Sequence, residues 1–171
     1  VSIKLSDVND NAPRFLSERT ELALSEDTAV GASITVVSAV DPDQGRAGRL
    51  SYALEGDAAD LFSLKEDSGW LSLRRPLDRE TTELLNLSLV ATDGGSPSSL
   101  SATTQLHITV LDANDNPPIF SGGKSLRMSV EENASAGSPL GKVDITDSDA
   151  EPQIKLYIVE GNEEGLFGIR D

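Results

Sequence analysis

Short segments in which apolar and polar residues alternate run along much of the chain, with turn residues between them. Alternation is clearest at 84–92, where one face of an extended segment would carry Leu85, Leu87, Leu89 and Ala91. A second segment, 103–111, would carry Leu106, Ile108 and Val110 on one face. Successive side chains of a strand point to opposite faces, so each segment has one core face and one solvent face.

Six segments are predicted to be strands: 21–24, 34–40, 50–54, 71–73, 84–92 and 103–111. No sustained helical period of 3.6 residues interrupts them. About seven short strands in roughly 100 residues are typical of a β-sandwich. The pattern therefore predicts an all-β fold, an antiparallel Greek-key β-sandwich of the immunoglobulin-like kind.

The chain also repeats itself. Residues 7–15 recur as 112–120, 105 positions later, and both copies contain Asn-Asp-Asn before a proline. Three further echoes keep this register within one residue: 25–31 with 131–137, 41–43 with 147–149, and 61–62 with 166–167. The register predicts tandem repeats, divided into the end of one repeat (1–13), a complete repeat (14–116) and the first half of another (117–171).

The last segment is expected to behave differently from the complete repeat. Half a sandwich leaves strand edges unpaired and an apolar face uncovered, so it is not stable alone. We therefore expect 117–171 to be loosely ordered or to borrow strands from another copy.

Acidic residues are concentrated in the repeated motifs. The chain has 29 acidic and 14 basic residues, a net charge of −15, which disfavours nucleic acid and anionic lipid and favours cations. Setting aside the motif carboxylates leaves 16 acidic residues, close to balance with the 14 basic ones. These carboxylates are Asp7, Asp10, Glu26, Asp41, Asp43, Asp78, Glu80, Asp93, Asp112, Asp115, Glu132, Asp147 and Asp149.

Clustered carboxylates repel one another unless a cation lies between them. The chain has no cysteine, and its single histidine, His107, falls on a predicted solvent-facing position. Ligands made only of oxygen favour Ca²⁺, whereas Mg²⁺ prefers fewer carboxylates and more water. An EF-hand is excluded, because the loop counted from Asp112 has Pro117 where glycine is required. A plain polar linker would explain one copy of the Asn-Asp-Asn motif, but two copies in register favour calcium.

The motifs themselves resemble the extracellular repeats of cadherins, in particular protocadherins and long Fat- or Dachsous-like cadherins. The resemblance rests on five stretches: Asp-Val-Asn-Asp-Asn-Ala-Pro at 7–13, Asp-Pro-Asp-Gln-Gly at 41–45, Leu-Asp-Arg-Glu at 77–80, Ala-Thr-Asp-Gly-Gly-Ser-Pro at 91–97 and Asp-Ala-Asn-Asp-Asn-Pro-Pro at 112–118. Trp70 is internal, so strand exchange through an N-terminal tryptophan is not implied.

The resemblance implies three calcium ions at each junction between repeats. After the complete repeat it assigns two ions to Glu26, Asp78, Glu80, Asp112 and Asp115, with Asp149 bridging, and a third to Asp147, Asn114 and the Asn116 carbonyl. At the earlier junction it assigns the third ion to Asn9, Asn11, Asp41, Asp43 and Asp93, while Asp7 and Asp10 lack their partners. Ala113 and Glu132, in the same motifs, are also assigned to the metal sites. Ala47 stands where many family members have Asn, at a position that acts through its backbone carbonyl.

The function implied is calcium-dependent cell–cell adhesion, in which ions stiffen tandem repeats that present homophilic or heterophilic faces. The expected partners are other cadherin ectodomains, of the same or a different protein, with no nucleic acid and no small-molecule substrate. The expected location is the extracellular face of a membrane that anchors the parent protein.

No catalytic set is recognised, so no enzyme is expected. Asp78 and Glu80 also fit an acid–base pair, but their place beside a repeat junction favours calcium. Two rival classes remain open: a calcium-dependent accessory module beside a catalytic domain, and a calcium reservoir, which the near-balance of the remaining charges argues against.

Two sequons, Asn86-Leu87-Ser88 and Asn133-Ala134-Ser135, predict N-glycosylation at Asn86 and Asn133. Asn86 falls on the predicted solvent face of 84–92. Asn133 directly follows the candidate ligand Glu132, which makes a glycan there less compatible with calcium. Trp70 is out of phase with Leu71 and Leu73 and is therefore predicted to face solvent.

Overall fold

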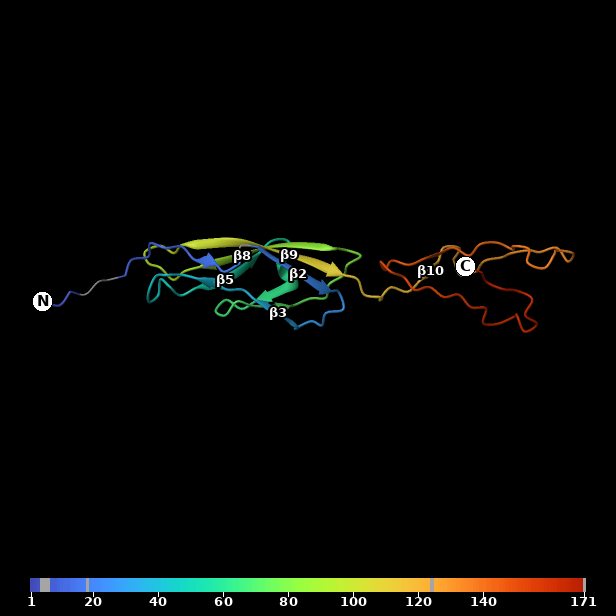
Figure 1. Cartoon of the computed structure of the whole chain (residues 1–171), viewed down its shortest axis with the longest axis horizontal. Helices are drawn as coiled ribbons and strands as arrows, with labels where there is room; N and C mark the ends of the chain where they lie inside the picture. Colours follow the sequence, from blue (N-terminus) through green and yellow to red (C-terminus); the bar gives the residue numbers. More distant parts are fainter. Residues whose placement is uncertain (4–6, 18, 124, 171) are drawn as a thin grey trace. The chain divides into compact units, whose positions relative to one another are not determined.

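The computed structural model describes residues 1–3, 7–17, 19–123 and 125–170 and divides into two compact units, Val1–Ala113 and Asn114–Asp171 (Figure 1). The boundary between the units lies inside the predicted linker motif 112–116. The predicted segment 1–13 includes residues 4–6, which are outside the described residues. The division into repeats at 13 and 116 stays a prediction.

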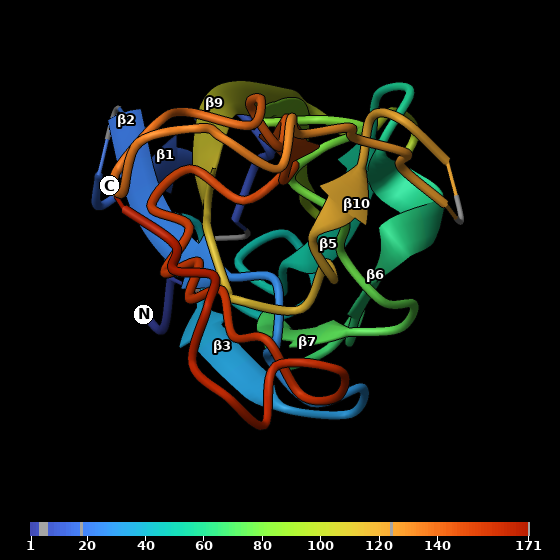
Figure 2. The ribbon, with the colours of Figure 1, turned by 90° about the vertical axis from the view of Figure 1, so that its right-hand side faces the viewer.

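The first unit contains two sheets and a short two-stranded ladder. The four-stranded sheet has the order β2-β9-β8-β5 and the three-stranded sheet the order β3-β7-β6, while β1 pairs with β4. Their bounds are β1 (Arg14–Phe15), β2 (Arg19–Ser25), β3 (Ser33–Val36), β4 (Ala39–Val40), β5 (Ser51–Glu55), β6 (Phe62–Leu64), β7 (Trp70–Leu73), β8 (Leu84–Thr92) and β9 (Ser101–Leu111). A 3₁₀ turn, η1 (Ala59–Leu61), precedes β6. In the end-on view β2 and β9 lie across the unit from β3 and β7 (Figure 2).

The hydrophobic core lies between the two sheets. The four-stranded sheet contributes the alternate residues Leu85, Leu87, Leu89 and Ala91 of β8 and Leu106, Ile108 and Val110 of β9. The three-stranded sheet contributes Phe62, Leu71 and Leu73. All are at most 5% exposed, so the alternating pattern assigned the core face of β8 and β9 correctly and the β-sandwich is confirmed.

One pairing differs from the predicted antiparallel arrangement. β2 runs parallel to β9, with Arg19 beside Gln105 and Ser25 beside Leu111, whereas β8 is antiparallel to both β9 and β5. Alternation of side chains is the same in parallel and antiparallel strands, so the sequence pattern carried no information on this direction.

The predicted strand 34–40 is two strands. β3 pairs with β7, and β4 pairs with β1, so the chain changes partner at Val37 and Ser38. There the Val37 N–H donates to the Gly69 carbonyl at 2.8 Å, and Ser38 accepts from the Leu16 N–H at 3.1 Å. The two-residue β1 and the three-residue β6 are too short to have shown a period in the sequence.

The second unit contains one ladder within 114–123 and 125–170. β10 (Ile119–Phe120) pairs antiparallel with β11 (Ile145–Thr146). Many apolar side chains of this unit are exposed, among them Leu126, Met128, Tyr157, Val159 and Leu166.

Across the described ranges, no helix is long and apolar enough to cross a membrane. The indole of Trp70 faces solvent as predicted, with 48% of the residue exposed.

Candidate metal centres

The strand directions place the predicted ligands of the first unit at two opposite ends of its sheet. Glu26 follows β2, Asp112 follows the parallel strand β9, and Glu80 precedes the antiparallel strand β8, so all three belong to one end. Asp93 follows β8 and therefore lies at the other end, as does the loop that precedes β5 and contains Asp41 and Asp43. Sequence positions far apart are thus gathered by strand topology alone.

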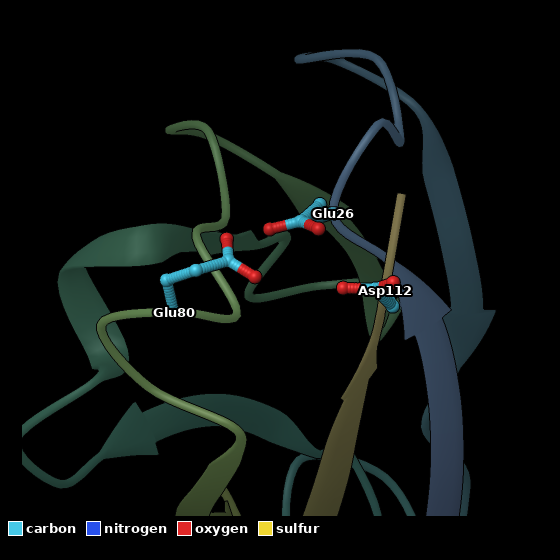
Figure 3. A group of neighbouring side chains, drawn as sticks. All are labelled: Glu26, Glu80 and Asp112. Carbon is cyan, nitrogen blue, oxygen red and sulfur yellow. The ribbon is translucent and has the colours of Figure 1, made fainter. Parts of the chain in front are cut away.

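The Glu26 cluster consists of Glu26, Glu80 and Asp112, each offering a carboxylate oxygen within 4.8 Å of the others. Their side chains point toward one another in Figure 3. Glu26 is 6% exposed, and its two oxygens accept from the Ala113 N–H and the Arg79 N–H, both at 2.7 Å. Backbone donors therefore hold the Glu26 carboxylate in one orientation.

Arg79 is the residue of this region that the sequence analysis missed. Its Nε donates to Asp112 Oδ1 at 2.6 Å, its Nη2 pairs with Glu80, and its Nη1 lies 3.4 Å from Glu83 Oε1. Burial lowers the pKa of Arg79, but the hydrogen bonds and charges of Asp112 and Glu80 outweigh it and raise that pKa above its ordinary value. The available signal was its position between two candidate ligands in Leu-Asp-Arg-Glu.

Asp78 was predicted with this group but does not belong to the cluster of three. Its carboxylate accepts from the Thr81 N–H at 3.0 Å and the Thr81 hydroxyl at 2.9 Å. It thereby fixes the turn that carries Arg79 and Glu80.

The predicted ligands at the other end, here called the Asp93 cluster, are Asn9, Asn11, Asp41, Asp43 and Asp93. They form two contacting groups, Asn9 with Asp93 and Asn11 with Asp43 and Asp41. Asp93 is 5% exposed, and its Oδ1 accepts from the Gly95 N–H (2.9 Å) and the Leu100 N–H (3.0 Å). Asn9 Nδ2 lies 3.4 Å from the same oxygen and donates to the Ser98 carbonyl at 3.1 Å. Burial raises the pKa of Asp93, but these donors outweigh it and hold that pKa below its ordinary value.

Asn11 joins the linker motif to the loop before β5. Its backbone N–H donates to Asp43 Oδ2 at 3.1 Å and its side-chain Nδ2 to Asp43 Oδ1 at 2.5 Å. Asp41 Oδ1 in turn accepts from the Asp43 N–H at 2.9 Å. Predicted ligands about 30 to 80 residues apart in sequence are therefore in direct contact.

Two glycines allow this close assembly. A Cβ at Gly95 would come within 2.0 Å of Asn9 Nδ2, and one at Gly48 within 2.1 Å of the Asp43 carbonyl oxygen. Any larger residue would push the Asn9 side chain or the 41–43 loop out of place.

The second unit repeats the arrangement of Asn11, Asp41 and Asp43. The Asn116 N–H and Nδ2 donate to Asp149 Oδ1 at 3.2 and 2.9 Å, and Asp147 Oδ1 accepts from the Asp149 N–H at 3.0 Å. The repeat detected in sequence is therefore also a repeat in hydrogen bonding.

Four buried oxygens in these groups have no hydrogen-bond partner. Among the side chains of the described residues, the buried polar atoms in this condition are Asn9 Oδ1, Asp41 Oδ2, Asp93 Oδ2 and Asp149 Oδ2. Buried polar atoms are almost always paired, because an unpaired one costs about 1–3 kcal/mol. All four are acceptors of the hard oxygen type, so these residues fit a calcium ion and not a softer metal.

The remaining predicted ligands are more peripheral. Asp7 Oδ2 accepts from the Gln44 N–H at 2.9 Å, Asp10 Oδ1 from Asn11 Nδ2 at 2.7 Å, and Asp115 Oδ1 from Asn116 Nδ2 at 2.9 Å. Ala47 lies in the turn before β5, and Asn114 and Glu132 are exposed.

Both sequon asparagines are exposed. Asn86 lies on the outer face of β8, where its Oδ1 is 2.6 Å from Nδ1 of His107 on β9. Glycosylation of Asn86 and Asn133 stays a prediction.

Comparison with known proteins shows that this chain is similar to cadherins. The family profile described as the cadherin domain matches residues 20–111. Mouse cadherin EGF LAG seven-pass G-type receptor 1 is 41% identical over 98% of this chain, and human protocadherin Fat 1 is 38% identical over 99% of it. The chain spans only 6% and 4% of the length of these two relatives.

Solved structures agree with the sequence matches. Three repeats of mouse cadherin-23, EC22–24, align with a TM-score of 0.77 at 34% identity, covering 85% of this chain and 46% of that one. A protocadherin gammaB7 EC3–6 cis-dimer aligns with a TM-score of 0.75 at 35% identity, covering 85% of this chain and 38% of that one.

Proposed function

The chain belongs to the cadherin family, and from this premise we propose that it is part of a calcium-dependent cell-adhesion ectodomain. Cadherin-family adhesion proteins are not enzymes, which agrees with the absence of a recognised catalytic motif. Because the chain covers a small part of its relatives, its calcium dependence, partners and location are proposals.

The observation that carries the proposal is the set of four buried, unpartnered oxygens. Asp41, Asp93 and Asn9 supply three of them in the first unit, and Asp149 supplies the fourth in the second. A bound Ca²⁺ would coordinate these oxygens and offset the cost of burying them. The same ion would neutralise carboxylates that otherwise repel one another.

We propose two kinds of calcium position. The Asp93 cluster would hold an ion through Asn9, Asn11, Asp41, Asp43 and Asp93, and its counterpart through Asn114, Asn116, Asp147 and Asp149. The Glu26 cluster would hold ions with help from Asp78. Sites of this extracellular type bind at about 10⁻⁴–10⁻³ M, which suits the outside of cells.

Bound ions would make a flexible connection between repeats stiff. Each ion would draw ligands from the linker motif and from loops of a folded repeat, so the linker would lose its freedom when the ion binds. A stiff row of repeats would then present adhesive faces to other cadherin ectodomains. The similarity to a seven-pass receptor and to a protocadherin supports an extracellular, membrane-anchored parent.

The test is thermal unfolding with and without about 2 mM CaCl₂, on the wild type and on Asp41→Asn with Asp93→Asn. At the affinities above, each site adds about 0.7–1.8 kcal/mol by mass action, or several degrees in Tm. The double variant should lose the part that comes from the Asp93 cluster. Asp67→Asn, in the exposed turn between β6 and β7, removes a carboxylate that belongs to neither cluster; it is the matched control and should keep the full response.

An unchanged Tm in calcium for the wild type contradicts calcium binding. The Asp41→Asn, Asp93→Asn double variant could keep the rise of Tm in calcium while an Asp112→Ala, Asp115→Ala double variant loses it. That result would assign calcium binding to the Glu26 cluster instead. Bead aggregation with and without calcium then tests adhesion directly. Calcium binding without aggregation would favour the alternative function, an accessory module beside a catalytic domain.

A further inference from the structure

We propose that Arg79 is a tethered competitor of calcium at the Glu26 cluster, and that its guanidinium sets how much calcium the cluster needs. The proposal rests on the function proposed above. It concerns a residue for which neither the sequence motifs nor the comparisons give a role.

The first observation is that Arg79 uses the same carboxylates that would bind the ion. Its Nε–H donates to Asp112 at 2.6 Å and its Nη2 pairs with Glu80, which are two of the three members of the cluster. Oxygen lone pairs that accept from a guanidinium are not free for a metal ion. A calcium ion that coordinates Asp112 Oδ1 or Glu80 Oε1 therefore requires these contacts to be broken or rearranged.

The second observation is that Arg79 is held firmly in this position. Its side chain is 14% exposed, and its backbone N–H donates to Glu26 Oε2 at 2.7 Å. Thr81 ties the same turn to Asp78 through two hydrogen bonds. Charge-assisted hydrogen bonds to carboxylates are about twice as strong as neutral ones, so the guanidinium is a substantial rival for a millimolar-range ion.

The third observation is a partner that the displaced guanidinium can keep. Glu83 is 71% exposed, and its Oε1 lies 3.4 Å from Nη1 of Arg79. A small rotation of the arginine would give up Asp112 and Glu80 and keep Glu83 and solvent. The arginine can thus leave the cluster without losing every counter-charge.

Arginine occupancy also has a benefit when calcium is low. Glu26, Glu80 and Asp112 repel one another, and a guanidinium among them offsets that repulsion. The cluster is therefore expected to stay assembled without an ion, at the cost of a weaker apparent affinity. The apparent dissociation constant rises by the inverse of the fraction of molecules whose site is competent to bind.

The experiment is a CaCl₂ titration followed by ¹⁵N NMR, which reads each end of the unit separately. The Ala113 amide reports on Glu26, and the Gly95 and Leu100 amides report on Asp93. The Arg79 Nε–H signal reports directly on the contact with Asp112. In the wild type, the Nε–H signal should move with the same midpoint as the Ala113 amide.

The variant is Arg79→Gln, and the matched control is Arg75→Gln, which removes an exposed arginine paired with Asp60 on the surface. Arg79→Gln should shift the Ala113 midpoint to about tenfold lower calcium and leave the Gly95 and Leu100 midpoints in place. Arg79→Lys keeps a charge but loses the planar fork of the guanidinium. Its Ala113 midpoint should therefore fall between those of the wild type and Arg79→Gln. Arg75→Gln should move none of these midpoints.

An Ala113 midpoint that stays or rises in both folded Arg79 variants overturns the proposal. If the Gly95 amide responds to calcium but the Ala113 amide responds in no protein, the competitor role fails while calcium binding at the Asp93 cluster stands. If no amide at either end responds in any protein, the proposed function fails as well. A response at Ala113 only after Arg79→Gln supports the proposal in its strongest form.

Discussion

The two units share one register of sequence but differ in structure. In the first unit, β2, β3 and β5 pair with β9, β7 and β8, all of which come from the second half of the repeat. The matching segments of the second unit, 125–131, 139–142 and 156–160, have no such partners among the described residues and form no strands there. The difference teaches that strand-forming sequence needs a pairing partner before it forms a strand.

What the units have in common supports this view. β1–β4 and β10–β11 are the same ladder, with Arg14 opposite Val40 and Ile119 opposite Thr146. The hydrogen bonds of Asn11 with Asp43 recur between Asn116 and Asp149. The ladder joins residues within the first half of a repeat, and the asparagine contact joins the preceding linker motif to that half. Neither feature uses the second half of a repeat, so both units can form them.

Hydrogen exchange should give the largest contrast between the units. Amides of β8, which pair on both sides, are expected to exchange at least about 10³-fold more slowly than those of 156–160, because β8 opens only on global unfolding. Amide exchange followed by NMR measures this ratio, with β10 as an internal reference for a two-residue ladder. Comparable protection at 156–160 would show that the second unit has strand pairing in solution.

A matched pair of phenylalanines should give the next largest contrast. Phe62 is 3% exposed, whereas Phe167, 105 residues later, is 45% exposed. Phe62→Ala should cost about 3–5 kcal/mol by emptying the core, and Phe167→Ala less than about 0.5 kcal/mol. Urea unfolding measures both values. Equal costs would mean that the second unit buries its apolar side chains as the first does.

A pair of tyrosines tests one hydrogen bond. The Tyr52 hydroxyl accepts from the Ala39 N–H at 3.0 Å and links β5 to β4, while Tyr157 is 73% exposed. Tyr52→Phe should cost about 0.5–1.5 kcal/mol, and Tyr157→Phe should leave the unfolding midpoint unchanged. The same urea curves provide the measurement. A neutral Tyr52→Phe would remove this link from the account of the first unit.

The smallest expected effect is one that should be similar in the two units. Asp41→Ala and Asp147→Ala each remove the acceptor of the N–H two residues later, at Asp43 and Asp149. In a calcium chelator, each should shift that amide signal by a similar amount and cost at most about 1 kcal/mol. Asp67→Ala is the control. A large effect in one unit only would show that the shared turn depends on the surrounding fold.

Sequence analysis predicted the parts of the fold that show a regular alternation of apolar and polar residues. Alternation found the core faces of β8 and β9. The family resemblance assigned Asn9 and Asp93 to one site, and the structure has these two side chains in contact. It did not recover the parallel direction of β2, because side-chain alternation is identical for either direction. It also missed the change of partner at Val37, because β1 and β4 have only two residues each. Arg79 was missed because a basic residue between two acidic ones is interpreted as neutralising their charge until its contacts are known.

The parallel ladder of β2 and β9 has a mechanical consequence. The chain enters β2 at Arg19, beside Gln105, and leaves β9 at Leu111, beside Ser25, so the entry and exit lie at opposite ends of the same seven-residue ladder. A pulling force along the chain would slide the two strands past each other. All rungs would then share the tension and break together, whereas an antiparallel pair pulled from one end would open one rung at a time. The direction of one strand thus suits the repeat to carry load.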